Sequence, residues 1–540
     1  MTEAAETEVP VLVVGAGPAG LMTCLLLSRY GVASLLVERH AQVSVLPRAM
    51  GINARTMEIF RGLGLAAKVE AIGVDLGDCP FQVELETLRG PLLGTVPRGG
   101  ASHAGGPGSP TPARLVFCAQ NRLEPMLQGQ LAASGVCQVR RGIELTMLSQ
   151  DRSGVTARLR ERSTNAERLV RAAYVVGADG AHSTVRAELG IDMRGHDHMS
   201  RELNILFDAD LWSALGDARA ILYEVRHPQL GAPCLFRSVD GRRRWSLLTP
   251  WFEDPSPQRC RELIQLCAAD SELQLEILAV GEWERATLLA DQFRQGRVFL
   301  AGDAAHRVTP AGAFGMNTSI QTAHNLAWKL AAVLQGWAGP GLLDSYETER
   351  RPWTAQTIEL SHRLNGQHRQ AAAQTLGHVL GTAYETGAFL PDGTPQAAAA
   401  DPVRDYVPSA RPGRRAPHVW LTHQGRQVST LDLFDGNFIL LSPSEAWCNA
   451  GRDVATQLDV PLRAYAITDP HWAKTYGVGD GGAALVRPDG LVAWRNVAPA
   501  ADCASDLRLA LTAVLDLRNR TMPAPSNGPS QRNPSTNIVV

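Results

Sequence analysis

The chain has 540 residues, which is too long for one simple domain of about 100–200 residues. Its hydrophobic fraction of 45% and charged fraction of 20% are typical of a globular protein and exclude wholesale disorder. The formal net charge of −2 gives no overall basic field, so no nucleic-acid partner is expected.

Cysteine usage and hydropathy indicate where the chain works. None of the nine cysteines forms a C-x-x-C pair, which argues against a disulfide framework and a zinc site. This pattern suits a reducing compartment, so we expect a cytoplasmic protein. Residues 1–8 are acidic where a secretory signal would be basic, and no uncharged apolar stretch reaches about 18 residues, so no membrane span is expected. His196 and His198 flank an aspartate, but nothing else supports a metal.

The first forty residues predict a strand, a turn, a helix and a second strand. Residues 11–14 form a continuous apolar run typical of a buried parallel strand. A glycine-rich turn at 15–20 leads into a helical pattern over 21–30, which ends at a glycine. A second apolar run follows at 33–37. Together these segments predict the first unit of a dinucleotide-binding domain.

The turn carries the spacing G-x-G-x-x-G through Gly15, Gly17 and Gly20. The first glycine permits the tight turn, the second lets backbone approach a pyrophosphate, and the third allows close helix–strand packing. Glu38 ends the second strand, where a ribose hydroxyl is expected. The competing interpretation is a plain glycine-rich turn beside an unrelated surface glutamate. We assign four neighbours to the same site: Ala16, Pro18, Ala19 and Arg39.

The rest of the chain predicts further domains. A Gly/Pro/Ser-rich segment at 98–113 is interpreted as a mobile loop, and alternating apolar residues after about 191 indicate antiparallel strands. An apolar strand at 169–176 belongs to the first domain. A strand at 297–301 and a helix over 317–334 follow the inserted sheet and belong to the same domain. The predicted division is a nucleotide-binding domain (1–190 with 284–390), an inserted sheet domain (191–283), a linker (391–413), a compact C-terminal unit (414–521) and a disordered tail (522–540).

Three further segments extend the glycine motif into a family pattern. They are 177–186 (GADGAHSTVR), 302–306 (GDAAH) and 311–330, which contains AGAFGMNT and NLAWKL. In this order they resemble the fingerprints of the single-component flavin-dependent aromatic hydroxylases, which include para-hydroxybenzoate hydroxylase and phenol hydroxylase. Residues 346–352 (YETERRP) resemble the next family segment, and 411–418 (RPGRRAPH) resemble the start of a thioredoxin-like domain in the phenol and polyketide hydroxylase branch.

The resemblance implies a fold and a cofactor site. The fold is α/β with an α+β insert: a Rossmann-like FAD-binding domain, an inserted antiparallel-sheet substrate domain and a thioredoxin-like C-terminal domain. Glu38 would hold the adenosine ribose, Arg48 the phosphates, and Asp303 the ribityl hydroxyls. The backbone at the start of the long helix would face the flavin. The remaining implied FAD residues are Gln120, Arg122, Leu145, Asp179, Gly315, Met316 and Asn317.

Two residues near these motifs have more than one interpretation. The cluster around Asp179 and Arg186 either serves FAD and NADPH or only stabilises its own turn. His306 looks like a base, but a turn or packing role is favoured. No catalytic side chain is assigned. Aromatic and neighbouring residues that could line a substrate cavity between the inserted sheet and the flavin helix are Tyr223, Phe236, Trp245, Trp283, Pro310 and Phe314.

The resemblance also implies a reaction. NADPH, bound transiently, would reduce FAD; the reduced flavin would trap O2 as a C4a-hydroperoxide and hydroxylate an electron-rich phenolic ring. We expect a polycyclic aromatic polyketide or similar secondary metabolite as substrate. A simple substituted phenol, Baeyer–Villiger oxygen insertion, and an FAD-bound protein that only sequesters its ligand are the alternatives. Without C-x-x-C, Cys448 and Cys503 are interpreted as packing residues and the C-terminal domain as structural, with homodimer formation as one role.

Overall fold

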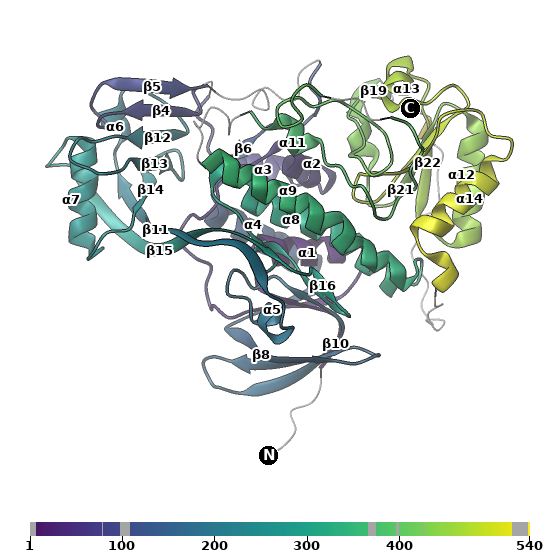
Figure 1. Ribbon diagram of the computed structural model, residues 1–540, viewed down its shortest axis with the longest axis horizontal. Coiled ribbons are helices and arrows are strands. Elements are labelled where there is room, and N and C mark those ends of the chain that lie inside the picture. The colour runs from purple at the N-terminus through teal and green to yellow at the C-terminus, as the bar shows by residue number, and fades with distance from the viewer. Residues whose placement is uncertain are drawn as a thin grey trace.

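The computed structural model describes residues 7–77, 79–97, 108–365, 374–395, 399–423, 425–520 and 538–539. Figure 1 shows a central α/β body with an antiparallel sheet on one side and a smaller C-terminal unit on the other. Most of the predicted loop at 98–113 and of the predicted tail at 522–540 lies outside the described residues.

A mainly parallel sheet forms the central body. Its strand order is β16-β17-β10-β1-β2-β7, and β9 and β8 extend it as antiparallel strands beside β10. Strand β1 pairs in parallel with β10 and β2, as its uninterrupted apolar sequence predicts. The bounds are β1 Thr7–Val14, β2 Ser34–Glu38, β7 Cys137–Arg141, β8 Ile143–Gln150, β9 Val155–Glu161, β10 Glu167–Gly177, β16 Arg294–Gln295 and β17 Val298–Leu300.

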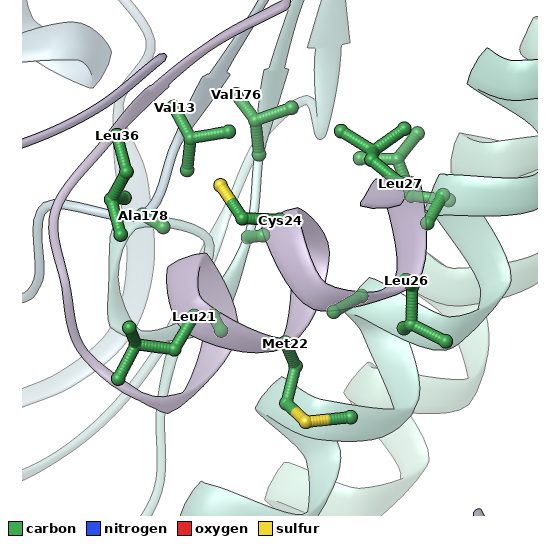
Figure 2. Packing of buried hydrophobic residues seen from close by; sticks show 14 of the residues in the cluster. Val13, Leu21, Met22, Cys24, Leu26, Leu27, Leu36, Val176 and Ala178 are labelled. Carbon is green, nitrogen blue, oxygen red and sulfur yellow. The ribbon is translucent and has the colours of Figure 1, made fainter. Parts of the chain in front are cut away.

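Helix α1 (Pro18–Arg29) packs its apolar side against this sheet. Figure 2 shows Leu21, Cys24 and Leu27 among strand residues that include Val13 and Val176. Each large aliphatic side chain buried in this way contributes about 1.5–3 kcal/mol of transfer free energy. The other elements of the central body are α2 Ala54–Gly62, α3 Ala66–Ile72, α4 Gln120–Ser134, α5 Thr184–Glu188, α8 Phe314–Leu334, α9 Ser345–Asn365, α11 Leu376–Leu380, and the paired strands β3 Gly51–Ile52 and β6 Val116–Phe117.

The antiparallel sheet is larger than the segment 191–283 predicts. Its order is β18-β15-β11-β14-β13-β12-β4-β5, so two strands from the first hundred residues join it. Strand β4 reaches it by parallel pairing with β12, a long-range contact that no local pattern announces. The bounds are β4 Gln82–Leu85, β5 Leu92–Val96, β11 Met193–Ala209, β12 Leu222–Val225, β13 Cys234–Ser238, β14 Arg244–Pro250, β15 Leu275–Ala290 and β18 His306–Arg307, with α6 Trp212–Leu215 and α7 Pro257–Ala268 beside them.

The C-terminal unit is a second α/β sheet. Parallel strands β21 and β22 flank α12, β23 pairs antiparallel with β21, and β24 pairs antiparallel with β23. Its likeness to thioredoxin stays a prediction. Cys448 and Cys503 are free thiols, the first buried and the second half-buried. The bounds are β19 Trp420–His423, β20 Arg426–Ser429, β21 Phe438–Ser442, α12 Glu445–Leu458, β22 Leu462–Ala466, α13 Pro470–Tyr476, β23 Ala483–Val486, β24 Val492–Asn496, α14 Cys503–Val514 and β25 Ile538–Val539.

The C-terminal unit and the central body share both a core and a buried ionic network. Trp328 of α8 packs its ring edge against Phe438 of β21, with centroids 5.8 Å apart. Below it, Glu349 of α9 accepts from Lys329 Nζ at 2.8 Å and from Arg487 Nη1 at 2.6 Å. Arg487 also binds Asp489. Because these side chains are 0–1% exposed, the two units form one continuous body.

Within the part of the chain that the structure describes, none of the helices combines the length and apolar composition needed to cross a membrane.

Candidate cofactor and substrate site

The three motif glycines play distinct geometric roles. Gly15 has a φ of +103°, and a Cβ there would lie 2.3 Å from the carbonyl oxygen of Ala178 on the neighbouring β10 side. A Cβ at Gly20 would lie 1.9 Å from the Gly15 carbonyl oxygen, so helix and strand meet only because it is absent. At Gly17, no described atom lies within 4 Å of a Cβ position. The turn is therefore rigid at its first and last glycine and open at the middle one.

The glycine turn and Glu38 are joined by direct hydrogen bonds. Glu38 Oε2 accepts from the Ala16 backbone N–H at 2.9 Å, and Oε1 accepts from the His40 N–H at the same distance. Pro18 is the first residue of α1, where its missing N–H costs no hydrogen bond. Arg39 is exposed beside His40. The acid thus lies beside the N-terminal, positive end of α1.

Arg48 and Asp303 come from distant segments and lie within electrostatic reach of each other. Asp303 sits in a 3-10 turn over Gly302–Ala304, directly after β17, and its side chain keeps contact with solvent. Burial by the surrounding protein raises the pKa of its carboxyl, and the positive charges of Arg48 and Arg307 oppose that rise. A carboxylate poised between cations and solvent is suited to accept hydrogen bonds from hydroxyl groups.

The N-terminus of α8 follows an unusual turn. Gly312 has a φ of +82° and Ala313 a φ of +54°, and the helix then begins at Phe314. Gly315 and Met316 are therefore in the first helical turn, whose backbone N–H groups have no intrahelical acceptor. The Asn317 side chain holds the turn in place: Nδ2 donates to Gly51 O at 2.8 Å, and Oδ1 accepts from Asn53 N–H at 3.0 Å. The hydrogen bonds of the Asn317 side chain therefore go to protein backbone.

Gln120 and Arg122 lie at the start of α4, next to the loop that carries Arg48. The Gln120 backbone N–H donates to Ala49 O at 2.8 Å, and its side chain donates to Glu124 at 2.7 Å. Arg122 Nη1 donates to Val239 O of the antiparallel sheet at 3.4 Å. Leu145 lies apart from this group, on β8 at a bulge, and its side chain is buried in the central core.

Asp179 is engaged by its own turn. Its Oδ1 accepts from Ser183 Oγ at 2.5 Å and its Oδ2 from the Val185 N–H at 3.1 Å. Arg186 then donates to Ala304 O at 3.0 Å and to Ala181 O at 2.9 Å. Arg186 therefore links two of the sequence fingerprints, and the contacts of both residues fit the turn-stabilising alternative.

Three of the predicted substrate-lining residues lie elsewhere in the structure. Tyr223, Phe236 and Trp245 are 0% exposed and pack in the core between the antiparallel sheet and α7. Side chains alternate between the faces of a strand, and these three share the face that α7 covers. Phe314 is buried among Leu360 and neighbouring apolar residues. Pro310 is exposed before α8, and Trp283 is half-buried on β15. Tyr223, Phe236 and Trp245 are therefore not proposed as substrate contacts.

The opposite face of this sheet, which we call the inner face, carries buried polar residues that sequence reasoning missed. Asn204 and Arg237 both donate to the carbonyl oxygen of Pro47, at 3.0 Å and 2.6 Å. Ser246 lies between them: its Oγ donates to Asn204 Oδ1 at 2.7 Å and accepts from Arg237 Nε at 3.2 Å. The alternation of the strands was the available signal, because these residues fall between the apolar ones. The inner face therefore contacts Pro47, the residue that precedes Arg48.

Comparison with known proteins identifies the family. A model of the FAD binding domain matches residues 8–361, and a model of the C-terminal region of aromatic-ring hydroxylases matches residues 409–517. The chain belongs to the FAD-dependent aromatic-ring hydroxylases. It is a flavin-dependent aromatic monooxygenase with FAD as its cofactor, as the resemblance implied.

Relatives of the hydroxylase match it over nearly the full length. Aklavinone 12-hydroxylase of Streptomyces purpurascens is 39% identical, over 94% of this chain and 99% of the relative. The 2,4-dichlorophenol 6-monooxygenase of Delftia acidovorans is 32% identical, over 94% of this chain and 98% of the relative. A solved ternary complex of aklavinone-11 hydroxylase with FAD and aklavinone superposes with a TM-score of 0.86 at 38% identity, over 95% of this chain and 100% of that chain.

The geometry of the hydroxylase fits FAD. The open space at Gly17 lies at the N-terminus of α1, where a pyrophosphate binds free N–H groups. Glu38 is held beside the same turn, and Asp303 presents a solvent-accessible carboxylate near Arg48. A Cβ at Gly315 would meet only Val308 Cγ2, at 3.3 Å, so the helix start stays narrow where the flavin is expected.

His306 does not have the properties of a base at neutral pH. Its ring is 0% exposed, and burial together with the nearby positive charge of Arg350 lowers its pKa to about 3. The ring is therefore neutral at pH 7. Among the residues that the structure describes, no group of three or more His, Cys, Asp or Glu side chains has an arrangement suited to a metal ion.

Proposed function

We propose that the hydroxylase uses NADPH and O2 to hydroxylate a phenolic ring of a polycyclic aromatic polyketide. The observation that carries the proposal is the full-length match to aklavinone-11 hydroxylase, solved with FAD and aklavinone, which includes the inserted sheet as well as the cofactor domain. The identity to aklavinone 12-hydroxylase, 39%, exceeds the 32% to the dichlorophenol enzyme.

Each of the proposed cofactor residues would bind a different part of FAD. The α1 N-terminus and the glycine turn would bind the pyrophosphate, Glu38 the adenosine ribose, Arg48 the phosphates and Asp303 the ribityl hydroxyls. Gln120, whose backbone N–H is bonded to Ala49 next to Arg48, would support the same chain of contacts. When bound, FAD supplies the redox chemistry: it takes a hydride from NADPH and activates O2 for transfer of one oxygen atom.

The start of α8 would stabilise negative charge on the reduced cofactor. The N–H groups of the first turn and the helix macrodipole favour an anion there by about 0.3–1 kcal/mol when exposed and up to about 2 kcal/mol when partly buried. No lysine or arginine occurs between Pro310 and Trp328, so this segment offers no cationic side chain for the same task. Gly315 lets the backbone approach closely.

The inner face of the sheet and the start of α8 would enclose the substrate. Its buried hydrogen-bonding groups are already satisfied by protein, so the ring would be oriented mainly by shape and by few polar contacts. Enclosure keeps water away from the site of oxygen transfer and holds the ring carbon in line with it.

A simple substituted phenol is the second candidate substrate, because a full-length relative is a dichlorophenol monooxygenase. The deciding experiment measures NADPH oxidation by the FAD-loaded enzyme with aklavinone and, in parallel, with 2,4-dichlorophenol. We expect aklavinone, as a representative polycyclic phenol, to stimulate oxidation and to gain one oxygen as a ring hydroxyl. Stimulation by 2,4-dichlorophenol and not by aklavinone would contradict the polyketide substrate and support a simple phenol.

A third arm separates the remaining alternatives. Fragmentation that places the new oxygen between two carbons, as an ester or lactone, would show Baeyer–Villiger insertion instead of hydroxylation. Tight ligand binding without any stimulated NADPH oxidation would indicate the sequestering protein.

A further inference from the structure

We propose that Arg237 and Asn204, on the inner face of the substrate sheet, are positioning residues that hold Arg48 in place for FAD. The inference rests on the proposed function in one respect, the contact of Arg48 with the cofactor. It adds that the sheet expected to bind the substrate also fixes this cofactor arginine.

The central observation is that two side chains from different strands converge on one carbonyl. Asn204 of β11 and Arg237 of β13 donate to Pro47 O at 3.0 Å and 2.6 Å, and that oxygen belongs to the peptide bond that leads into Arg48. A carbonyl oxygen has two lone pairs, so both are used. The peptide plane before Arg48 therefore cannot rotate without breaking two buried hydrogen bonds.

Ser246 makes the two donors a single unit. Its hydroxyl donates to Asn204 Oδ1 at 2.7 Å and accepts from Arg237 Nε at 3.2 Å. Arg237 is 8% exposed, Asn204 6% and Ser246 0%. A fully connected buried network of this kind fixes the orientation of each member.

Arg237 is a costly residue to place here. No carboxylate among the described residues pairs with it, and burial alone lowers its pKa to about 10, so it stays charged at pH 7. An apolar residue would fill the same space without the desolvation penalty of a buried cation. Among the described residues, its hydrogen-bond partners are the Pro47 carbonyl and the Ser246 hydroxyl, so its charge acts most directly on the Pro47 carbonyl.

Apolar contacts attach the same loop, residues 45–50, to the sheet. A Cβ at Gly281 of β15 would lie 2.3 Å from Leu46 Cδ1, so the glycine makes room for that side chain. Gly281 is the register partner of Asn204. Met50, at the other end of the loop, packs with Leu206 and Val239 of the sheet. The loop is therefore held on both sides of the Pro47 carbonyl.

A double-mutant cycle tests the proposal. The apoprotein is prepared in four forms, wild type, Arg237→Met, Arg48→Ala and the double variant, and the FAD dissociation constant is measured by quenching of flavin fluorescence. Loss of a hydrogen bond from a charged donor should weaken FAD binding about tenfold in the wild-type background. In the Arg48→Ala background, Arg237→Met should change FAD affinity less than about twofold, because its effect passes through Arg48.

Controls separate positioning from folding. Arg237→Lys should restore part of the affinity, because it keeps a cationic donor, and Arg244→Met should have no effect, because Arg244 is an exposed member of the same sheet. If Arg237→Met does not fold, Asn204→Ala removes the second donor and takes its place in the cycle.

The outcomes are distinct. Equal weakening in both backgrounds, or none in the wild type, would overturn the positioning role and leave the proposed function intact. Unchanged FAD affinity in Arg48→Ala would overturn both the positioning role and the cofactor contact of Arg48. Failure of the wild-type apoprotein to bind FAD would contradict the cofactor site itself.

Discussion

Replacing Arg487 by methionine should weaken the junction between the C-terminal unit and the central body. The guanidinium donates to both oxygens of Glu349, at 2.6 Å and 2.9 Å, and to both oxygens of Asp489, at 2.9 Å and 2.5 Å. Burial alone would raise the pKa of Glu349, but Arg487 and Lys329 hold it well below its usual range. In the variant, Glu349 would keep its ion pair with Lys329, whereas Asp489 would lose its buried ion pair with Arg487.

Breaking a buried pair by removing one partner costs about 3–5 kcal/mol, because the other charge is left uncompensated. We expect this loss in the free energy of unfolding at pH 7, measured by urea denaturation of the FAD-loaded enzyme. The matched control is Arg201→Met. Arg201 pairs with Glu282 at 2.8 Å, but both side chains are more than half exposed, so the expected loss is below about 1 kcal/mol. Equal small losses in the two variants would refute the claim that the buried network holds the units together.

Four further substitutions test the cofactor site and the burial of His306. Asp303→Ala should weaken FAD retention by about 1–3 kcal/mol without unfolding the chain, since ribityl hydroxyls lose their acceptor; equal FAD content after gel filtration would remove Asp303 from the site. Gly17→Val fills the open space at the turn and should abolish FAD binding in a folded protein, whereas Gly20→Val, with its Cβ 1.9 Å from Gly15 O, should disrupt folding. Full FAD loading of Gly17→Val would contradict the pyrophosphate assignment. The pKa of His306 is about 3 when folded against 6.5 for the ordinary side chain, so below pH 6.5 the unfolded state binds the extra proton and stability falls as pH falls. His306→Met should reduce this slope by about 1.4 kcal/mol per pH unit between pH 6 and 5, and identical slopes in unfolding experiments would show that His306 is not buried as a neutral ring.

The local features of the cofactor domain could be predicted from the sequence. The uninterrupted apolar run at 11–14 predicts β1 in a parallel sheet, the apolar segment 169–176 predicts β10, and the glycine spacing predicts the turn that Gly15 and Gly20 form. In each case the residues that carry the sequence pattern are the same residues, within a few positions, that form the element. The local sequence pattern determines these elements, so a single sequence is enough to predict them.

The substrate sheet could be predicted only in part. Antiparallel strands after residue 191 follow from alternation, but the addition of β4 and β5 depends on parallel pairing between β12 and β4, about 140 residues apart. Tyr223, Phe236 and Trp245 are aromatic candidates for the substrate site, but they face α7 instead. Which face of a sheet a helix covers is a tertiary property. The buried polar residues around Arg237 lie on the opposite face of the sheet, so the sequence alone does not identify them.

We propose that this chain inserts one atom of O2 into an aromatic polyketide. The direct measurement incubates the FAD-loaded enzyme with NADPH, aklavinone as the polycyclic phenol and 18O2, and determines the mass of the product. We expect a product heavier by one 18O atom, located on a ring carbon, with one NADPH consumed for each product formed. A product that carries oxygen from water, or NADPH oxidation with no oxygenated product from any polycyclic or simple phenol, would contradict it.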